Sequence, residues 1–365
     1  MRFDLFYEIC IPPWQVGGEA AAYQRVLDEI TLADELGFGC SWLVEHHFTR
    51  HYSHCSKPEL LLAAAAQRTH RIRLGLGVIP MPYHHPIHVA ERVAALDILS
   101  NGRLEVGIGR GFSPTEYGTF AGTMAESRSL VEEALQVLRL SFEDRPINFA
   151  GGHYKFEQLD MLPHVVQRPH PPLWGAAVSP QTFAWTARQQ LGLLAGPFKP
   201  WWMTRHDIRT YLDTWNAASA PRIGMTLGIL CLRDARRARR LAKPAMEWFY
   251  RELYKTTLPV LEKLYPSYEH FRELGRFRKL MRIGIDFSVL EGMGMVIAGD
   301  PAHCVAALQK YRAAGVTHVL CAIGAGAVEN AVVLESMRCM AEEVLPAFAS
   351  TPDIQFLGTP SAAQR

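Results

Sequence analysis

The sequence has no apolar run that approaches the roughly 20 residues of a membrane-spanning helix. It also lacks a basic-then-apolar signal sequence, because Met1 leads directly into the strand-like pattern of residues 2–6. The seven cysteines are an odd number and contain no CxxC pair, which argues against a disulfide framework and against a zinc-ribbon site. We therefore expect a protein of the reducing cytoplasm that binds no metal and no membrane.

A strong charge of one sign is absent as well. The formal net charge is +2, and basic residues are spread along the chain apart from residues 233–243, which are typical of the solvated face of a helix. Nucleic acid is therefore not an expected partner. No Gly-x-Gly-x-x-Gly follows an expected strand, so the sequence predicts no dedicated nicotinamide domain.

Strand-like apolar segments alternate with segments of helical periodicity along most of the chain. The expected strands are residues 3–8, 40–44, 73–79, 104–108, 173–177, 191–195, 223–232 and 316–321. Eight strand-then-helix units predict an α/β fold, the (β/α)8 TIM barrel. Gly151 and Gly152 predict a small hairpin between the fourth and fifth units.

A chain of 365 residues that is 48% hydrophobic can bury one large core. We expect a single barrel domain over residues 1–350. Residues 251–295 interrupt the alternation and are too many for an ordinary barrel loop, so they predict a lid-like insertion after the seventh unit. Residues 351–365 are expected to form a frayed C-terminal tail.

Polar residues follow the second expected strand, which runs directly into Glu45, His46 and His47. The carboxyl end of a barrel strand is where barrel enzymes carry their catalytic residues. Alternatively, Glu45 and His47 pair with neighbouring strands and only satisfy buried polarity. A metal site that adds His84 and His85 is less favoured, because adjacent histidines on an extended chain point to opposite sides.

A second polar site is expected where the helix after the fifth strand begins. Ser179 is a preferred N-cap, Pro180 fits the first helical position, and Thr182 is the third helical residue. Unpaired backbone N–H groups and the positive end of the helix dipole can bind an anion there. Arg110 follows the neighbouring fourth strand, so its guanidinium can reach the same phosphate. If Arg110 were absent, the sequence would predict only that Ser179 caps its helix.

Several segments occur in an order that is jointly specific: residues 42–49, 107–111, 179–182 and 299–301. With them the chain resembles the bacterial luciferase-like family of flavin-dependent monooxygenases, and the luciferase subunits more than the deazaflavin-using members. The resemblance spans essentially the whole chain. It implies an enzyme that receives FMN as FMNH2 from a separate flavin reductase and uses dioxygen to oxidise a small organic substrate through a flavin peroxide.

The resemblance also implies roles for single residues. His46 matches the imidazole that handles the flavin peroxide, with Glu45 beside it as a second catalytic residue. Arg110, Ser179 and Thr182 match the phosphate site. The remaining matches line the flavin site, and the last two form a non-prolyl cis peptide beneath the ring: Phe6, Phe112, Gly77 and Val78. We further expect a homodimer.

One departure from the family is Gly109, because the luciferase α subunit carries a reactive cysteine there. A glycine is expected to leave room beside the ring for a bulkier substrate, so the long-chain aldehyde of luciferase and light emission are not carried over. Two other functions stay open on the same barrel. One is a deazaflavin-dependent hydride-transfer enzyme, and the other is a catalytically silent flavin-binding subunit.

Overall fold

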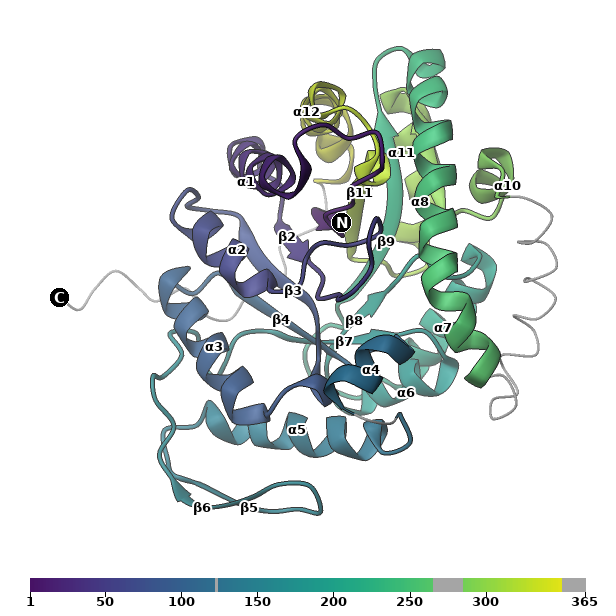
Figure 1. Cartoon of the computed structure of the whole chain (residues 1–365). Coiled ribbons are helices and arrows are strands. Elements are labelled where there is room, and N and C mark those ends of the chain that lie inside the picture. Colours follow the sequence, from purple (N-terminus) through teal and green to yellow (C-terminus); the bar gives the residue numbers. More distant parts are fainter. Residues whose placement is uncertain (122–123, 265–284, 350–365) are drawn as a thin grey trace.

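The computed structural model describes residues 1–121, 124–264 and 285–349. Eight parallel strands close into a barrel at the centre of the molecule (Figure 1). In order around the ring they are β1 (Arg2–Tyr7), β2 (Cys40–Leu43), β3 (Arg73–Pro80), β4 (Leu104–Gly109), β7 (Leu173–Ala177), β8 (Gly192–Ala195), β9 (Ile223–Cys231) and β11 (His318–Ile323). The ring closes where β9 pairs with β8 and β11, and β11 with β1. The predicted (β/α)8 barrel is confirmed.

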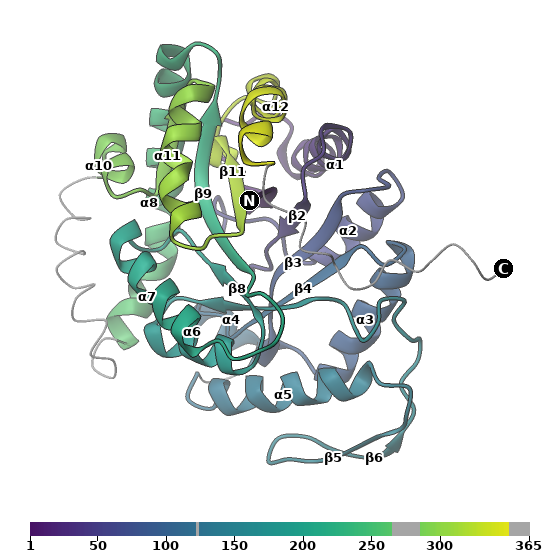
Figure 2. The same cartoon turned by 180° about the vertical axis from the view of Figure 1, so that it is seen from behind.

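Helices surround the barrel on its outside, as Figures 1 and 2 show from opposite sides. They are α1 (Gly18–Leu36), α2 (Pro58–Ala66), α3 (Pro86–Leu99), α5 (Ser127–Ser141), α6 (Pro180–Arg188), α7 (Trp201–Thr214), α8 (Ala235–Leu264), α11 (Pro301–Ala313) and α12 (Asn330–Cys339). Shorter helices are α4 (Pro114–Phe120), after β4, and α10 (Phe287–Gly292), before α11. Within the described ranges, no helix combines the length and the apolar character needed to cross a membrane.

Two tryptophans fill the barrel lumen. The rings of Trp42 and Trp174 meet edge to face at 5.3 Å between centroids, and both side chains are buried. Each indole N–H has a buried carboxylate acceptor, Asp4 at 3.0 Å and Glu105 at 2.6 Å. Gly75 leaves the space that the Trp42 ring occupies, because a Cβ on Gly75 would lie 2.4 Å from that ring. The missing side chain of Gly75 therefore lets an indole approach the backbone of β3 closely.

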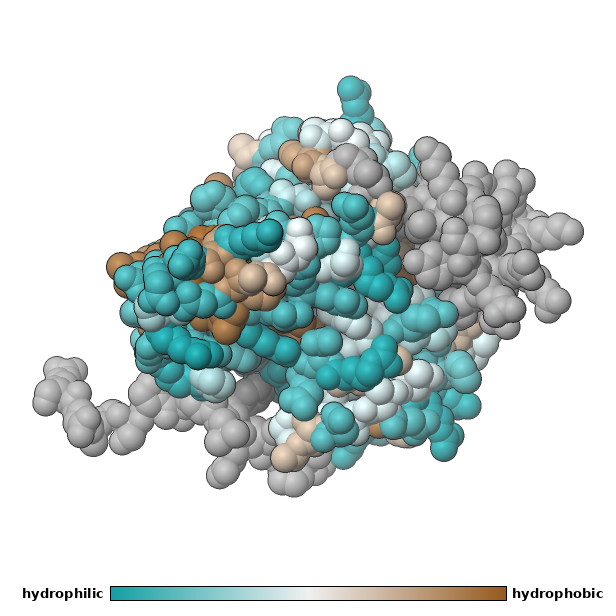
Figure 3. Space-filling model, turned by 90° about the horizontal axis from the view of Figure 1, so that it is seen from below, coloured by the Kyte–Doolittle hydropathy of each residue, from teal (hydrophilic) through white to brown (hydrophobic). Residues whose placement is uncertain are grey.

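The predicted hairpin is confirmed as β5 (Ile147–Ala150) paired antiparallel with β6 (Lys155–Leu159). It lies on the outside of α5 in both views (Figures 1 and 2). Seen from below (Figure 3), the surface is mostly hydrophilic, and hydrophobic residues gather on the side where α2 and α3 lie in Figure 1. Leu60 of α2 and Ile98 and Leu99 of α3 are exposed.

The region after the seventh strand differs in part from expectation. Residues 251–264, the first part of the expected insertion, continue α8. Tyr250, Leu253 and Tyr254 are buried one turn apart and keep this helix against the barrel. Residues 265–284 and the tail from residue 350 lie outside the described residues, so the lid-like insertion and the frayed tail stay predictions.

A short strand was missed. β10 (Val296–Gly299) pairs with the second half of β9, beyond the point where β8 leaves it. The apolar run of four residues is too short for periodicity to separate a strand from a buried helix segment.

The tryptophan layer gives a stability prediction. Gly75→Ala should lower the free energy of unfolding by about 1–3 kcal/mol, because the buried indole of Trp42 cannot move aside. The control is Gly118→Ala in α4, where a Cβ would meet nothing within 4 Å and alanine favours the helix by up to about 1 kcal/mol. Urea unfolding measures both, and equal effects would show that the lumen is not tightly packed.

Candidate active site

A cavity lies at the carboxyl ends of the barrel strands, above the tryptophan layer. Phe6, Val78, Leu194 and Leu320 line it and also pack on the tryptophan cluster, so the lumen packing forms its floor. Every residue selected from the sequence lines this one cavity: Phe6, Glu45, His46, Gly77, Val78, Arg110, Phe112, Ser179 and Thr182. The structure therefore brings together strand-end residues that lie far apart in the chain. Their individual roles remain predictions.

The peptide bond between Gly77 and Val78 is cis, as the resemblance implied. The expectation about Gly109 is wrong. A Cβ on Gly109 would lie 2.7 Å from a methyl carbon of Val78, so the valine side chain already fills the space that the glycine was expected to leave. No additional room for a substrate arises at this position.

Polar side chains meet where β4 and β7 end side by side, and we call this place the anion-binding corner after the role predicted for it. Ser179 caps α6, because its hydroxyl accepts the Thr182 N–H, and the two hydroxyl oxygens lie 3.0 Å apart. The Arg110 Nε donates to the Ser127 hydroxyl at 3.0 Å. In the part of the chain that the structure describes, the two terminal nitrogens of Arg110 have no hydrogen-bond acceptor. They are available to an anion at the start of α6.

A small cavity adjoins this corner and adds donors that the sequence reading missed. Arg128 of α5 and Trp185 of α6 line it together with Arg110 and Thr182. The indole N–H of Trp185 is buried without an acceptor among the described residues. Arg128 is the second residue of the helix that begins at Ser127, and only the packing of α5 beside α6 reveals that it faces the corner.

His46 and His47 point to opposite sides, as expected for neighbours on an extended chain. The Nδ1 of His46 lies 3.4 Å from Glu116 Oε1, and its Nε2 lies 3.9 Å from Glu8 Oε2. Burial disfavours the imidazolium, but the nearby carboxylates outweigh burial and raise the pKa of His46. Glu8 and Glu116 also line the cavity and were not selected from the sequence.

Glu45 lies in a different network. Its carboxylate is 3.0 Å from His47 Nε2, 2.7 Å from His84 Nε2 and 3.6 Å from Lys57 Nζ. This matches the alternative in which Glu45 and His47 satisfy buried polarity, and a catalytic role for Glu45 stays a prediction. His85 contacts the rings of His88 and Tyr154 instead. Among the described residues, no group of three or more His, Cys, Asp or Glu side chains could hold a metal ion.

Lys199 is a further lining residue that sequence reasoning missed. It follows β8, is 2% exposed, and donates to the Val178 carbonyl at 2.6 Å while pairing with Asp207. Burial lowers its pKa. Lysine is common on surfaces, so no sequence signal marks this one as buried.

Comparison with known proteins shows where this architecture recurs. A family model described as luciferase-like monooxygenase matches residues 1–318. The alkanal monooxygenase alpha chain of Photorhabdus luminescens is 24% identical over 364 residues, which cover 95% of this chain and 96% of that relative. Protein y4wF of Sinorhizobium fredii is 37% identical over 173 residues, 47% of this chain and 50% of its own length. The oxygenase component of the flavin-dependent trigonelline monooxygenase of Acinetobacter baylyi is 32% identical over 186 residues, 50% of each chain. The matches thus span about half the length of the last two relatives.

Solved structures share the fold over nearly the whole chain. Monooxygenase RslO1 of Streptomyces bottropensis has a TM-score of 0.80 at 27% identity, covering 96% of this chain and 100% of its own. The oxygenating constituent of 3,6-diketocamphane monooxygenase from Pseudomonas putida, in complex with FMN, has a TM-score of 0.71 at 18% identity, covering 95% and 98% of the two chains. A coenzyme F420 dependent reductase of Methanopyrus kandleri has a TM-score of 0.69, also at 18% identity, covering 95% and 99%. At 18% identity these last two show a common fold alone.

The network around Glu45 predicts a pH effect on stability. Burial alone would raise the pKa of Glu45, but hydrogen bonds with His47 and His84 and the charge of Lys57 lower it to about 2. A depressed pKa stabilises the fold above the ordinary value near 4.5, and this stabilisation is lost as the pH falls toward 2.

Between pH 7 and pH 3, the wild type should therefore lose about 2 kcal/mol more unfolding free energy than Glu45→Gln, which has no charge to lose. Urea unfolding at several pH values measures the difference. Parallel curves for the two proteins would show that the carboxylate of Glu45 is not preferentially stabilised in the fold.

Proposed function

Because the chain belongs to the luciferase-like monooxygenase family, we propose that it is the oxygenase component of a two-component flavin-dependent monooxygenase. A separate flavin reductase supplies FMNH2, and dioxygen and a small organic molecule are the other substrates. One observation carries the proposal: a single cavity joins an anion-binding corner to a buried histidine that lies between two carboxylates.

The residues present fit FMN. Arg110 and Arg128 supply the positive charge that a phosphate needs, and Ser179, Thr182 and the start of α6 supply neutral donors. The unpaired indole N–H of Trp185 is a donor without an acceptor, which a phosphate oxygen would satisfy. When bound, reduced FMN supplies the electrons that activate dioxygen, so that one oxygen atom can pass to the substrate.

The chain itself contributes water exclusion and proton transfer. Val44, Ala176 and Leu194 are among the apolar residues that line the cavity and keep water from the reacting groups. His46 can hold or release a proton at Nε2, because the neighbouring carboxylates stabilise its imidazolium. Glu45 orients His47 and His84 at the rim and can support His46 electrostatically.

The partners follow from the same proposal. The relative from Acinetobacter baylyi is named an oxygenase component, which supports a reductase as the partner of this chain. We also propose that the protein acts in the cytoplasm, where a reductase can supply reduced flavin. We also propose a homodimer that covers the exposed apolar residues Leu60, Ile98 and Leu99 of α2 and α3.

The anion-binding corner gives a binding prediction. Arg110→Ala should weaken FMN binding by about 1.5–3 kcal/mol, the range for a hydrogen bond to a charged group, and should hardly change the binding of riboflavin, which lacks the phosphate. A matched control is Arg145→Ala, which removes an exposed arginine that does not line the cavity. Fluorescence titration measures both ligands, and equal losses for FMN and riboflavin would assign Arg110 a structural role.

The histidine gives a turnover prediction. His46→Ala should lower turnover by about 10²-fold or more, the usual scale for a general acid or base, while FMN affinity stays within a few-fold. His47→Ala is the control, because its imidazole pairs with Glu45, so its loss should appear as lower thermal stability. Oxygen consumption with chemically reduced FMN measures turnover without a reductase.

The same assay distinguishes the alternatives. The F420 dependent enzyme shares this fold, so the fold alone does not choose the cofactor. Tight binding of an oxidised deazaflavin without oxygen consumption would replace the proposal by hydride transfer. Flavin binding without any turnover would make the chain a silent subunit.

A further inference from the structure

Glu8 is a buried residue at the end of β1, and only one of its two carboxylate oxygens has a hydrogen-bond donor among the described residues. Its Oε1 accepts the Tyr52 hydroxyl at 2.7 Å, and the side chain is 7% exposed. Its Oε2 has no hydrogen-bond partner among the described residues and lies 3.9 Å from His46 Nε2. A buried carboxylate oxygen without a donor is costly, so its position facing an imidazole calls for a physical reason.

The carboxylate on the other side of His46 differs. Glu116 Oε1 accepts the backbone N–H of His47 at 2.8 Å, and Oε2 accepts the Tyr83 hydroxyl at 3.1 Å. Both oxygens of Glu116 therefore have donors. Glu116 Oε1 lies 3.4 Å from His46 Nδ1, which has no hydrogen-bond partner among the described residues, and Nε2 faces the free oxygen of Glu8.

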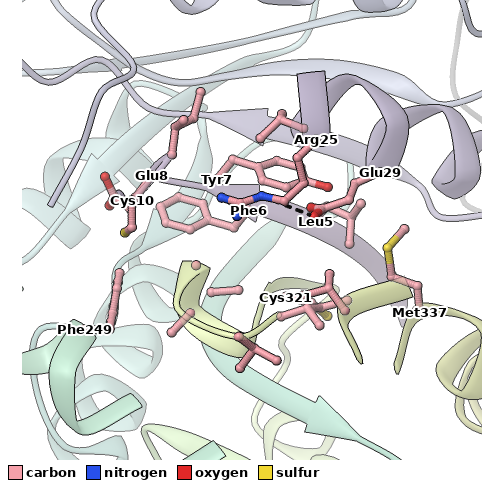
Figure 4. A pocket seen from close by; sticks show the side chains of 18 residues that line it. Leu5, Phe6, Tyr7, Glu8, Cys10, Arg25, Glu29, Phe249, Cys321 and Met337 are labelled. Carbon is pink, nitrogen blue, oxygen red and sulfur yellow. Dashed lines mark ion pairs between the residues drawn. The ribbon is translucent and has the colours of Figure 1, made fainter. Parts of the chain in front are cut away.

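Glu8 also lies in the wall between two cavities. A second cavity sits behind β1, between α1, α8, β11 and α12, and Figure 4 shows it with Tyr7, Glu8, Arg25 and Glu29 around it. Of the residues that line this second cavity, only Phe6 and Glu8 also line the cavity that holds His46. Glu8 is thus the one ionisable residue with access to both.

We propose that Glu8 exchanges a proton with His46 and passes it to and from the second cavity. Once the side chains close the 3.9 Å gap to hydrogen-bond distance, the Nε2–H bond of the imidazolium breaks as an Oε2–H bond forms on Glu8. The reverse step restores the imidazolium. Protons can then enter and leave without opening the cofactor cavity to water. The exchange is a property of the chain itself, whereas its use in turnover rests on the proposed function.

The surroundings raise the pKa of both groups. Burial raises the pKa of Glu8, while the His46 charge and the Tyr52 hydrogen bond oppose this and the Glu116 charge adds to it. On the far side of the second cavity, burial raises the pKa of Glu29 to about 7, with Arg25 at 3.7 Å as its ion-pair partner.

Other ionisable groups also face the pair. They are Glu45, which favours the imidazolium, the thiols of Cys10 and Cys55, whose pKa burial raises, and Arg110, Lys199 and Tyr254 across the cavity.

The test uses the cofactor-free full chain. Protein labelled with ¹⁵N-histidine is titrated by NMR, and the His46 ring signals are assigned from their loss in His46→Gln. Glu8→Gln should lower the pKa of His46 by about one unit or more, because the neighbouring carboxylate no longer stabilises the imidazolium. Glu8→Asp keeps a carboxylate and should restore most of the shift, and Glu29→Gln should leave His46 unchanged.

Infrared spectroscopy gives the second measurement. The carbonyl band of a protonated carboxylic acid should grow over the pH range in which His46 titrates, be absent in Glu8→Gln and persist in Glu29→Gln. An unchanged His46 pKa in Glu8→Gln, or equal shifts in Glu8→Gln and Glu29→Gln, would overturn the exchange. A shifted pKa in a chain that shows no FMNH2-dependent turnover would leave the exchange in place and remove the proposed function instead.

Discussion

The edge-to-face pair of Trp42 and Trp174 determines how the rest of the barrel is used. Eight strands leave a lumen just wide enough for side chains, and two indoles occupy it, with each N–H satisfied by a buried carboxylate. Asp4 is fully buried, and burial raises its pKa to about 7. Because the lumen is closed, any ligand must bind above it, at the carboxyl ends of the strands.

The buried carboxylates at the strand ends differ in the hydrogen-bond donors and charges that surround them. Glu45 lies beside two imidazoles and a lysine, which keep its pKa low, and Glu116 has a donor on each oxygen. Among the described residues, Glu8 has one donor and one free oxygen. Three buried glutamates around two adjacent histidines thus differ in the number of donors they receive. That difference separates the positioning groups from the group that can take up a proton.

Much of this arrangement could be predicted from the sequence, because it is local. Strand-then-helix alternation gave the ring of strands, the alternation of side chains separated His46 from His47, and Ser179 before a proline indicated the start of α6. What could not be predicted depends on contacts between distant segments. Arg128 and Glu116 lie on helices whose packing no periodicity specifies, and Val78 fills the space beside Gly109 only because β3 and β4 are neighbours. Glu8 ends the first strand much as Glu45 follows the second, and only its distance to His46 distinguishes it from an ordinary buried carboxylate.

The order of the strands around the barrel also places the residues predicted to bind the cofactor and those predicted to transfer a proton on different strands. The anion-binding corner belongs to β4 and β7, the cis peptide to β3, His46 to the end of β2, and Glu8 to the end of β1. Neighbouring strands therefore carry, in order around the ring, the residues predicted to bind a phosphate, an apolar floor and the pair proposed to exchange a proton. The fold itself does not decide the cofactor, because an FMN complex and an F420 dependent enzyme share it. In this chain Glu8 and Glu116 face opposite ring nitrogens of His46, so a change at Glu8 should alter the protonation of one imidazole while the floor and the anion-binding corner keep their own contacts.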